Sequence, residues 1–222
     1  MSNNGMLGSS VSKKVIMGLT GLFLISFLVV HLGINLCALL DDGGETFNIA
    51  AEFMAKNLVI RTMEIGLFLG FIIHIVDGLY LEFKNRQARP VAYYKSPGSE
   101  NSTWYSRSMG LLGTLLLIFL IVHLAHFWVK SRFGDITDEY GRENLYLIMA
   151  QVFKNPIVVV LYVISQISLA YHLLHGFQSA FQPLGFNHPK YSPLIKVTGT
   201  AYAILVPLLF AIIPVVLYFR HA

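Results

Sequence analysis

Cysteine is almost absent from this chain of 222 residues, in which Cys37 is the only one. A single cysteine excludes a disulfide within the chain, a covalently attached haem of the CxxCH type and an iron–sulfur cluster held by this chain alone. A glycine-rich dinucleotide fingerprint is missing as well. The sequence therefore lacks the motifs with which one polypeptide holds a nucleotide cofactor, a c-type haem or a cluster.

Charged residues are also scarce, at 13% of the chain against about 25% in a typical soluble domain. The deficit falls in long apolar runs, and hydrophobic residues reach 55%. The net charge of +4 comes without a basic tract dense enough for nucleic acid, and the cations lie between the apolar runs. This distribution is typical of loops at a lipid headgroup surface, so we expect membrane lipid and no nucleic acid around the chain.

Five apolar segments are each long enough to span a hydrocarbon core of about 30 Å at about 1.5 Å per residue. They cover residues 15–40, 58–82, 108–130, 156–178 and 195–219, and the stretches between them are polar and rich in turn-forming residues. The last segment contains Pro207 and Pro214, which membrane helices tolerate where neighbours satisfy the freed carbonyls. The sequence predicts an all-α integral membrane protein, a single five-helix transmembrane bundle over residues 1–222.

The first apolar run follows Lys13 and Lys14, as the core of a signal peptide would. The run from 15 to 40 is too long for such a core, and the acidic and glycine residues 41–44 follow it without a small-x-small cleavage site. We expect a retained helix.

The distribution of Lys and Arg predicts the orientation of the helices. The side that holds the N-terminus carries nine of the 16 residues, and the opposite side carries seven together with the acids of residues 41–52 and 135–143. Since the loops richer in Lys and Arg face the cytoplasm, we expect a cytoplasmic N-terminus and a C-terminus outside.

Six of the eight histidines lie inside the first four apolar segments, where ionisable groups are costly and usually functional. Four of them lie at matched depths, 16 or 17 residues from the polar edge at which their segment begins. These four are His31, His74, His123 and His172. Because successive helices alternate in direction, His31 and His123 share one level near the outer side, and His74 and His172 share another near the inner side.

Two imidazoles at one level, from two helices, suit the bis-histidine ligation of one haem iron. At about 1.5 Å per residue the two levels lie about 14 Å apart, close enough for electron transfer between two haems. The sequence thus predicts a bundle that holds two haems of the b type, one between His31 and His123 and the other between His74 and His172.

Small residues support this hypothesis, because a haem ligated at one level must pass the helices that ligate the other. Such residues lie near the level of the other haem in each of the four helices. They are Gly18, Gly21, Gly66, Gly110, Gly113 and Ser165. Close packing between membrane helices would explain the same residues.

His126 and His175 each follow a predicted ligand by three residues and remain alternative ligands. They break the regularity of depth, so contacts with haem propionates, contacts with quinone or simple hydrogen bonding suit them better.

Other polar residues near the ends of the helices are candidates for the surroundings of the haems. Arg61 and Glu64, near the outer haem, could hold a propionate and pass a proton to quinone, or form an interfacial ion pair. Asp77, one turn beyond His74, could support that imidazole or reach the interface. The inner surface offers Gln178, Ser179 and Gln182, with Trp104, Tyr93 and Tyr94 nearby, for propionates, for a partner protein or as an aromatic belt.

The chain resembles the cytochrome b membrane anchors of succinate:quinone oxidoreductases, the single-subunit type with five helices and two haems. The stretches that carry this resemblance are FLVVHLGINL (27–36), ETFNIAAEFM (45–54), FIIHIVDGLY (71–80), LLLIFLIVHL (115–124) and YHLLHGFQSAFQPLG (171–185). The resemblance implies the same four axial ligands, His31, His74, His123 and His172, paired first helix with third and second with fourth. It places the His74–His172 haem nearer the iron–sulfur subunit.

The resemblance also implies partners and a reaction. A flavoprotein subunit would oxidise succinate, an iron–sulfur subunit would pass the electrons to this chain, and quinone, menaquinone or another, would be reduced in a bacterial cell membrane. The chain itself has no residues for succinate chemistry, so its expected work is electron transfer, quinone binding and anchoring within respiratory complex II. Ala170 and Tyr171 stand where the family's fumarate reductases place an acid, which argues against a proton path there.

Other functions are compatible with a five-helix membrane chain. The same subunit could serve a quinol:fumarate reductase, since the sequence does not set the direction of electron flow. A cytochrome b of the complex III type would need two ligands 13 or 14 residues apart on one helix, and no two histidines here have that arrangement. A haem-free transporter or scaffold would need broken helices or polar lining residues near the midplane, and only the last segment has prolines in its interior.

Overall fold

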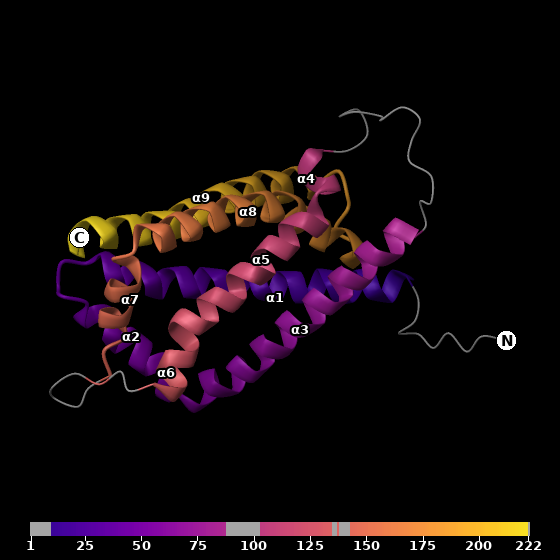
Figure 1. Ribbon diagram of the computed structural model, residues 1–222. Helices are drawn as coiled ribbons and strands as arrows, with labels where there is room; N and C mark the ends of the chain where they lie inside the picture. The colour runs from indigo at the N-terminus through magenta and orange to yellow at the C-terminus, as the bar shows by residue number, and fades with distance from the viewer. Residues whose placement is uncertain (1–9, 88–102, 135–136, 138–142, 222) are drawn as a thin grey trace.

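The computed structural model describes residues 10–87, 103–134, 137 and 143–221 (Figure 1). Its long helices are α1 (Ser10–Leu36), α3 (Leu58–Gln87), α5 (Met109–His123), α8 (Pro156–Phe181) and α9 (Ser192–His221). Helix α5 continues through a π-helical segment, η3 (Leu124–Trp128), into α6 (Val129–Phe133). The shorter elements are η2 (Cys37–Leu39), α2 (Glu45–Lys56), α4 (Trp104–Arg107), α7 (Leu145–Phe153) and η4 (Gln182–Leu184). The described residues form no strand beyond the isolated bridge between Thr137 and Glu143.

Five helices in the described part of the chain are long and apolar enough to cross a membrane, which confirms the predicted architecture. They are Val11–Leu39, Leu58–Gln87, Met109–Phe133, Pro156–Leu184 and Ser192–His221. Each begins or ends a few residues beyond the predicted bounds. Successive spans run in opposite directions, so the N-terminus and the C-terminus lie at opposite ends of the bundle (Figure 1).

Asparagine caps set where two of the spans begin. The side-chain oxygen of Asn57 accepts the backbone N–H groups of Val59 and Ile60, at the start of α3. Asn155 accepts the N–H of Ile157 at 2.9 Å, and Pro156 occupies the first position of α8. A cap oxygen satisfies donors that have no partner within the helix, and proline at the first turn needs none. The sharp polar edges of these segments are therefore helix starts.

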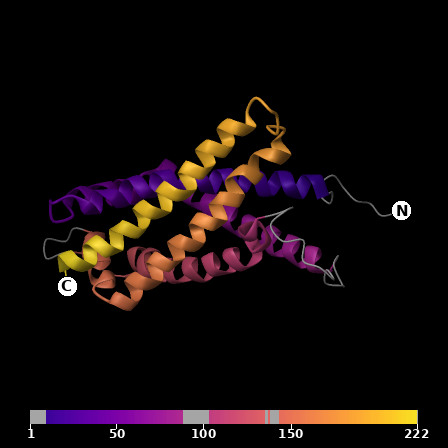
Figure 2. The ribbon, with the colours of Figure 1, turned by 90° about the horizontal axis from the view of Figure 1, so that it is seen from above.

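Helix α8 is the centre of the packing. It lies antiparallel against α9 and also contacts α1 and α5, whereas α3 lies at the side of the bundle against α1 (Figures 1 and 2). Eight residues of α8 and seven of α9 are buried, compared with Gly70 alone in α3 and Leu112 alone in α5. The helices that carry His74 and His123 thus bury much less of their own surface than the α8–α9 pair does.

Helices α2 and α7 cover the end of the bundle that holds the C-terminus, named the outer end after the predicted orientation, where the sequence predicted polar stretches rich in turn-forming residues. Phe47 of α2 and Tyr146 of α7 are buried and belong to one hydrophobic core with Leu217 of α9. Asn48 joins the two helices, since its amide donates to Asn144 and its oxygen accepts the N–H of Tyr146. Helix α2 buries Phe47 from among polar residues, whereas α7 is apolar except for Gln151 and buries four of its nine residues.

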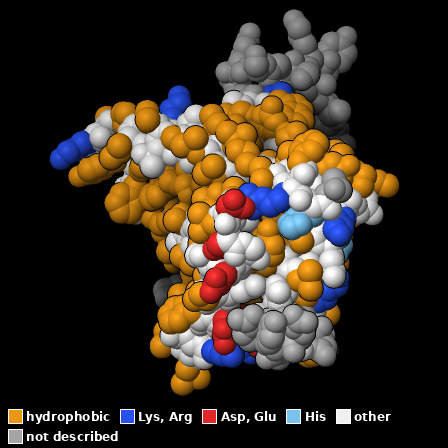
Figure 3. All heavy atoms as spheres, turned by 90° about the vertical axis from the view of Figure 1, so that its left-hand side faces the viewer, with side chains coloured by type: hydrophobic (Ala, Val, Ile, Leu, Met, Phe, Trp, Pro, Cys, Tyr) orange, Lys and Arg blue, Asp and Glu red, His pale blue; other side chains and the backbone are white. Residues whose placement is uncertain are grey.

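The C-terminal residues of α9 hold this outer end together. The guanidinium of Arg220 donates to the carbonyls of Ala38, Leu39 and Leu40, where α1 ends. His221 lies 3.1 Å from the hydroxyl of Tyr146. Figure 3 views the molecule from this end, and acidic side chains form a line across it. The carbonyls left unpaired at the end of α1 thus find a charged donor.

Two adjacent glycines before α2 both have positive φ, and only one of them meets a neighbour. Gly43 has φ of 66° with nothing within 4 Å of an added Cβ, whereas a Cβ on Gly44 (φ 87°) would overlap the ring of Tyr146. Asp42 secures this turn by accepting the N–H groups of Gly44 and Thr46, and the hydrogen bonds from Thr46 hold the pKa of Asp42 below its ordinary value.

We therefore predict that Gly44→Ala destabilises the protein more than Gly43→Ala. The Gly43 variant should lose about 1–2 kcal/mol from the left-handed conformation alone, and the Gly44 variant about 1–3 kcal/mol more because the buried Tyr146 ring must move. Thermal unfolding of the two variants in detergent measures the difference. Equal losses would contradict the packing of Tyr146 against Gly44.

Candidate functional site

The structure brings the four depth-matched histidines together as two pairs. The ring centres of His31 on α1 and His123 on α5 lie 5.7 Å apart, with the ring planes at 89°. Those of His74 on α3 and His172 on α8 lie 6.3 Å apart, with the planes at 68°. All four side chains are half-buried within the spans. These are the pairs that counting from the polar edges predicted, although ligation itself stays a prediction.

Both separations fit a single metal atom held between two imidazoles. A metal–nitrogen bond is about 2 Å long, and the centre of an imidazole ring lies roughly 1 Å beyond the nitrogen. Two imidazoles on opposite sides of one metal atom therefore have ring centres about 6 Å apart. Among the described residues no three His, Cys, Asp or Glu side chains gather as they would around an ion bound by protein alone. A planar cofactor that supplies four of its own ligands, as haem does, therefore suits these pairs better than a bare ion.

The side chains next to the inner pair are small, and one of them carries a hydroxyl group. The hydroxyl oxygen of Thr20 lies 3.2 Å from Nδ1 of His74. A Cβ added to Gly21 would lie 3.6 Å from Cε1 of His74, and one added to Gly113 would lie 3.9 Å from Cε1 of His172. Two of the small residues predicted to face the inner level are therefore in contact with its histidines.

Other small residues serve different contacts. A Cβ on Gly18 would lie 2.7 Å from the carbonyl oxygen of Ala180, so this glycine permits α1 and α8 to approach closely. Gly110 lies against the side chain of Glu82, and nothing lies within 4 Å of a Cβ on Gly66. Ser165 is buried and donates to the carbonyl of its own helix at Leu161. Helix packing, the alternative explanation, thus accounts for Gly18.

Aromatic rings surround the outer pair. Phe27 stacks on His31 at 5.2 Å, and Phe119 and Phe127 lie 5.6 Å and 5.4 Å from His123. The amide of Asn35 donates to the carbonyl of His31 and lies 3.4 Å from its Nδ1. The outer pair therefore lies among aromatic rings, with the amide of Asn35 as a polar neighbour of His31.

The two alternative histidines have hydrogen-bond partners of a different kind. Nδ1 of His126 lies 3.0 Å from the hydroxyl of Tyr162, and the two rings are stacked within 12°. Nε2 of His175 lies 3.1 Å from the hydroxyl of Ser179. In the described part of the chain, neither ring contacts a histidine of another helix. This geometry favours their neighbours His123 and His172 as the ligand pairs.

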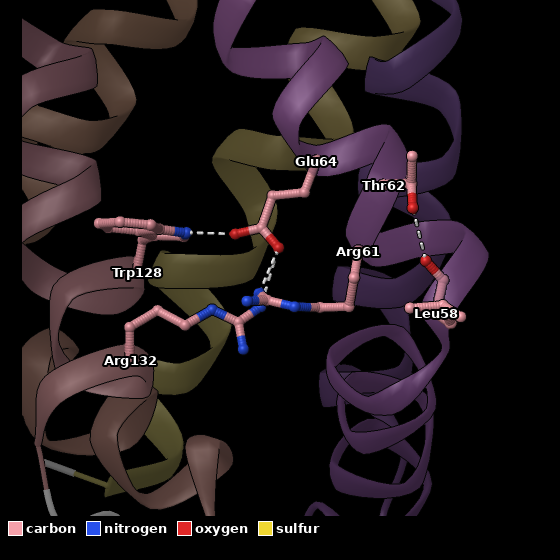
Figure 4. Close-up of polar contacts among 6 residues, drawn as sticks. All are labelled: Leu58, Arg61, Thr62, Glu64, Trp128 and Arg132. Atoms are coloured by element: carbon pink, nitrogen blue, oxygen red, sulfur yellow. Dashed lines mark hydrogen bonds and ion pairs between the residues drawn. The ribbon is translucent and has the colours of Figure 1, made fainter.

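Glu64 lies at the centre of a polar cluster near the outer end of α3 (Figure 4). One carboxylate oxygen accepts from Arg61 at 2.5 Å and from Arg132 at 3.0 Å, and the other accepts the indole N–H of Trp128 at 2.7 Å. The Glu64 and Arg132 side chains are only 20% and 23% exposed. The predicted Arg61–Glu64 pair is therefore present, but as part of a larger network.

Trp128 and Arg132 were not predicted as members of this cluster. They lie four residues apart across the end of η3 and the start of α6, so they share a face. Trp128 also contacts Phe68, one turn beyond Glu64, with ring centres 5.1 Å apart. The sequence contained a signal for this cluster in its spacing. Phe68 follows Glu64 by four residues, and Arg132 follows Trp128 by four, so each pair shares one face of a helix.

The remaining candidates lie toward the inner end. The Trp104 ring lies 5.4 Å from Tyr171, the residue before His172. The hydrogen bond of His74 goes to Thr20 and not to Asp77, whose Oδ2 is buried without a partner among the described residues. Ser179 bonds His175, Gln178 precedes it on α8, and Gln182 begins η4. Tyr93 and Tyr94 lie outside the described residues.

Comparison with known proteins gives one informative relative. The succinate dehydrogenase cytochrome b558 subunit of Bacillus subtilis (strain 168) is 29% identical to the chain over 155 residues, which are 69% of this chain and 69% of the relative. No protein-family model and no solved structure matches the chain. This similarity confirms the resemblance predicted from the sequence: the chain is similar to a cytochrome b subunit of succinate dehydrogenase.

Proposed function

We propose that the chain is the membrane anchor of a succinate:quinone oxidoreductase and carries electrons through two b-type haems. The observation that carries this proposal is the formation of two imidazole pairs at two levels, from four different helices. His31 and His123 would hold the outer haem iron, and His74 and His172 the inner one. The name of the Bacillus subtilis relative, a cytochrome b558, supports haem of the b type.

When bound, the haems supply one-electron chemistry inside the hydrocarbon core. The chain's own residues hold the four imidazoles at fixed depths, and aromatic rings surround His31 and His123 at the outer level. Thr20 supports one ring of the inner level. From the residue counts, the two levels are about 14 Å apart along the membrane normal, which suits transfer from the inner to the outer side.

Quinone reduction at the outer end would use the Glu64 cluster. Reducing a quinone to a quinol takes up two protons, so a site for it needs a carboxylate or another group that can pass protons. Glu64 offers such a group, and its bonds to Arg61, Arg132 and Trp128 fix its position. The guanidinium groups of Arg61 and Arg132 keep N–H donors beyond those that bond Glu64, and these suit a quinone carbonyl oxygen.

The partners follow from the relative's name, which is that of a succinate dehydrogenase subunit. The inner end of the bundle, with α4 and the Trp104–Tyr171 contact, would face the iron–sulfur subunit, and a flavoprotein subunit would lie beyond it. The N-terminus would then lie in the cytoplasm of a bacterial cell, with α2, α7 and the C-terminus outside.

The haem content tests the proposal directly. The purified chain should bind two b-type haems, counted from a reduced-minus-oxidised spectrum and a haem assay per chain. Alanine at His31, His74, His123 or His172 should remove at least one haem. His126→Ala and His175→Ala, the matched controls three residues away, should keep both. A wild-type chain without haem would refute the proposal, and loss of haem in a control would reassign that ligand.

The role of Glu64 can be separated from its effect on structure. Glu64→Gln should lower quinone reduction by the assembled complex about 100-fold, the usual contribution of a general acid or base, while both haems stay bound. Glu52→Gln removes a carboxylate from the exposed ion pair with Lys56 and should leave the rate unchanged. A Glu64→Gln rate equal to that of wild type would exclude this carboxylate from proton transfer.

The orientation can be tested with single cysteines in a Cys37→Ala background. Glu45→Cys lies at the proposed outer end and Lys190→Cys at the inner end, and both positions are exposed. A membrane-impermeant maleimide should label the first variant in intact cells and the second only after the cells are broken. The reverse pattern would invert the proposed orientation.

A further inference from the structure

Thr20 is a polar residue of α1 that lies 11 residues before His31, the histidine of its own helix, and beside the histidine of another. Its hydroxyl oxygen lies 2.8 Å from the carbonyl oxygen of Ile16 and 3.2 Å from Nδ1 of His74 on α3. A third contact, to the carbonyl of Met17, is 3.2 Å. Thr20 therefore connects the backbone of the helix that bears His31 to an imidazole of the other level.

The number of available protons determines the direction of these hydrogen bonds. A threonine hydroxyl has one proton to donate and two lone pairs with which to accept. The carbonyl of Ile16, one turn earlier, is the nearest acceptor and is the usual partner of a threonine inside a helix. With its proton donated there, the hydroxyl oxygen can only accept from His74, so Nδ1 of His74 carries the imidazole proton.

This tautomer leaves Nε2 of His74 as the nitrogen with a free lone pair. An imidazole binds a metal through its unprotonated nitrogen, and the hydrogen bond of the other nitrogen selects which one that is. Thr20 thus prepares His74 for ligation through Nε2. Gly21, the next residue, lies beside Cε1 of the same ring, since a Cβ there would be 3.6 Å away. Two consecutive residues of α1 therefore hold the His74 ring.

His172, the second proposed ligand of the inner haem, has no such hydrogen bond among the described residues. Nδ1 of His172 is buried without a hydrogen-bond partner among the described residues. Gly113 of α5 lies beside its Cε1, as Gly21 lies beside that of His74, but Leu112 precedes Gly113 where Thr20 precedes Gly21. The hydrogen bond of Thr20 is accordingly specific to one ligand of the inner level.

We propose that Thr20 is a positioning residue for the inner haem, which fixes the tautomer and plane of its ligand His74 from the helix that ligates the outer haem. The inference rests on the proposed function and deepens it. An acceptor on the Nδ1 proton raises the electron donation of the imidazole to iron, and this favours the oxidised state. Thr20 therefore strengthens haem binding at the inner level and lowers the reduction potential there.

The test replaces the hydroxyl while keeping the shape of the side chain. Thr20→Val should raise the potential of the inner haem and weaken its binding about 10- to 100-fold, the usual effect of removing a group that supports a metal ligand. The outer haem should keep its wild-type potential. Thr20→Ser, which restores the hydroxyl, should return both properties toward wild type. Redox titration by absorbance and low-temperature EPR reports the two haems separately, and His172→Ala identifies the inner signal.

Thr114 of α5 supplies the matched control. Its hydroxyl donates to the carbonyl of Gly110 at 2.8 Å, the same bond to the preceding turn that Thr20 makes to Ile16. Thr114→Val should leave both potentials unchanged. Two haems in wild type with an unshifted inner potential in Thr20→Val would overturn the role of Thr20 and leave the proposed function standing. A shift of equal size in Thr114→Val would also overturn it, and a haem-free wild type would overturn both proposals.

Discussion

An imidazole inside the hydrocarbon core loses its hydration, and this cost is the constraint from which the arrangement of the bundle follows. Each of the four depth-matched histidines meets an imidazole from another helix. At these contacts α1 and α5 are level at His31 and His123, and α3 and α8 are level at His74 and His172. Packing by α9 and the outer helices α2 and α7 then holds the set in place, since most buried residues belong to α8, α9 and the outer core.

Helices α1 and α5 contribute residues to both histidine pairs. Each carries a histidine of the outer pair, and each presents a glycine to a histidine of the inner pair, Gly21 to His74 and Gly113 to His172. A movement of α1 along its axis would therefore change both levels at once. The two redox sites proposed here are mechanically connected through these helices, in addition to any electronic connection between haems.

The histidine pairs could be predicted from the sequence because they depend only on a constant rise per residue and on alternating direction. Helices α2 and α7 could not, since their apolar faces are stabilised by each other and by Leu217, over a hundred residues from Phe47. The packing partner of Gly18 could not be predicted either, because only the fold shows that Ala180 lies against it. The depth of a histidine can be counted along its own helix, whereas these contacts join segments that are distant in the sequence.

The π-helical segment Leu124–Trp128 determines how Trp128 faces relative to His123. In a regular α-helix, five residues turn the chain by about 140° beyond one full turn, so Trp128 would point away from the face of His123. Bonding from i to i+5 brings the two closer to one line. The same stretch can then direct His123 toward His31 and Trp128 toward Glu64. His123 and Trp128 lie about 7 Å apart along the axis in either helix type, but the π-helical segment sets the direction in which Trp128 faces, and a search for a 3.6-residue period cannot detect that.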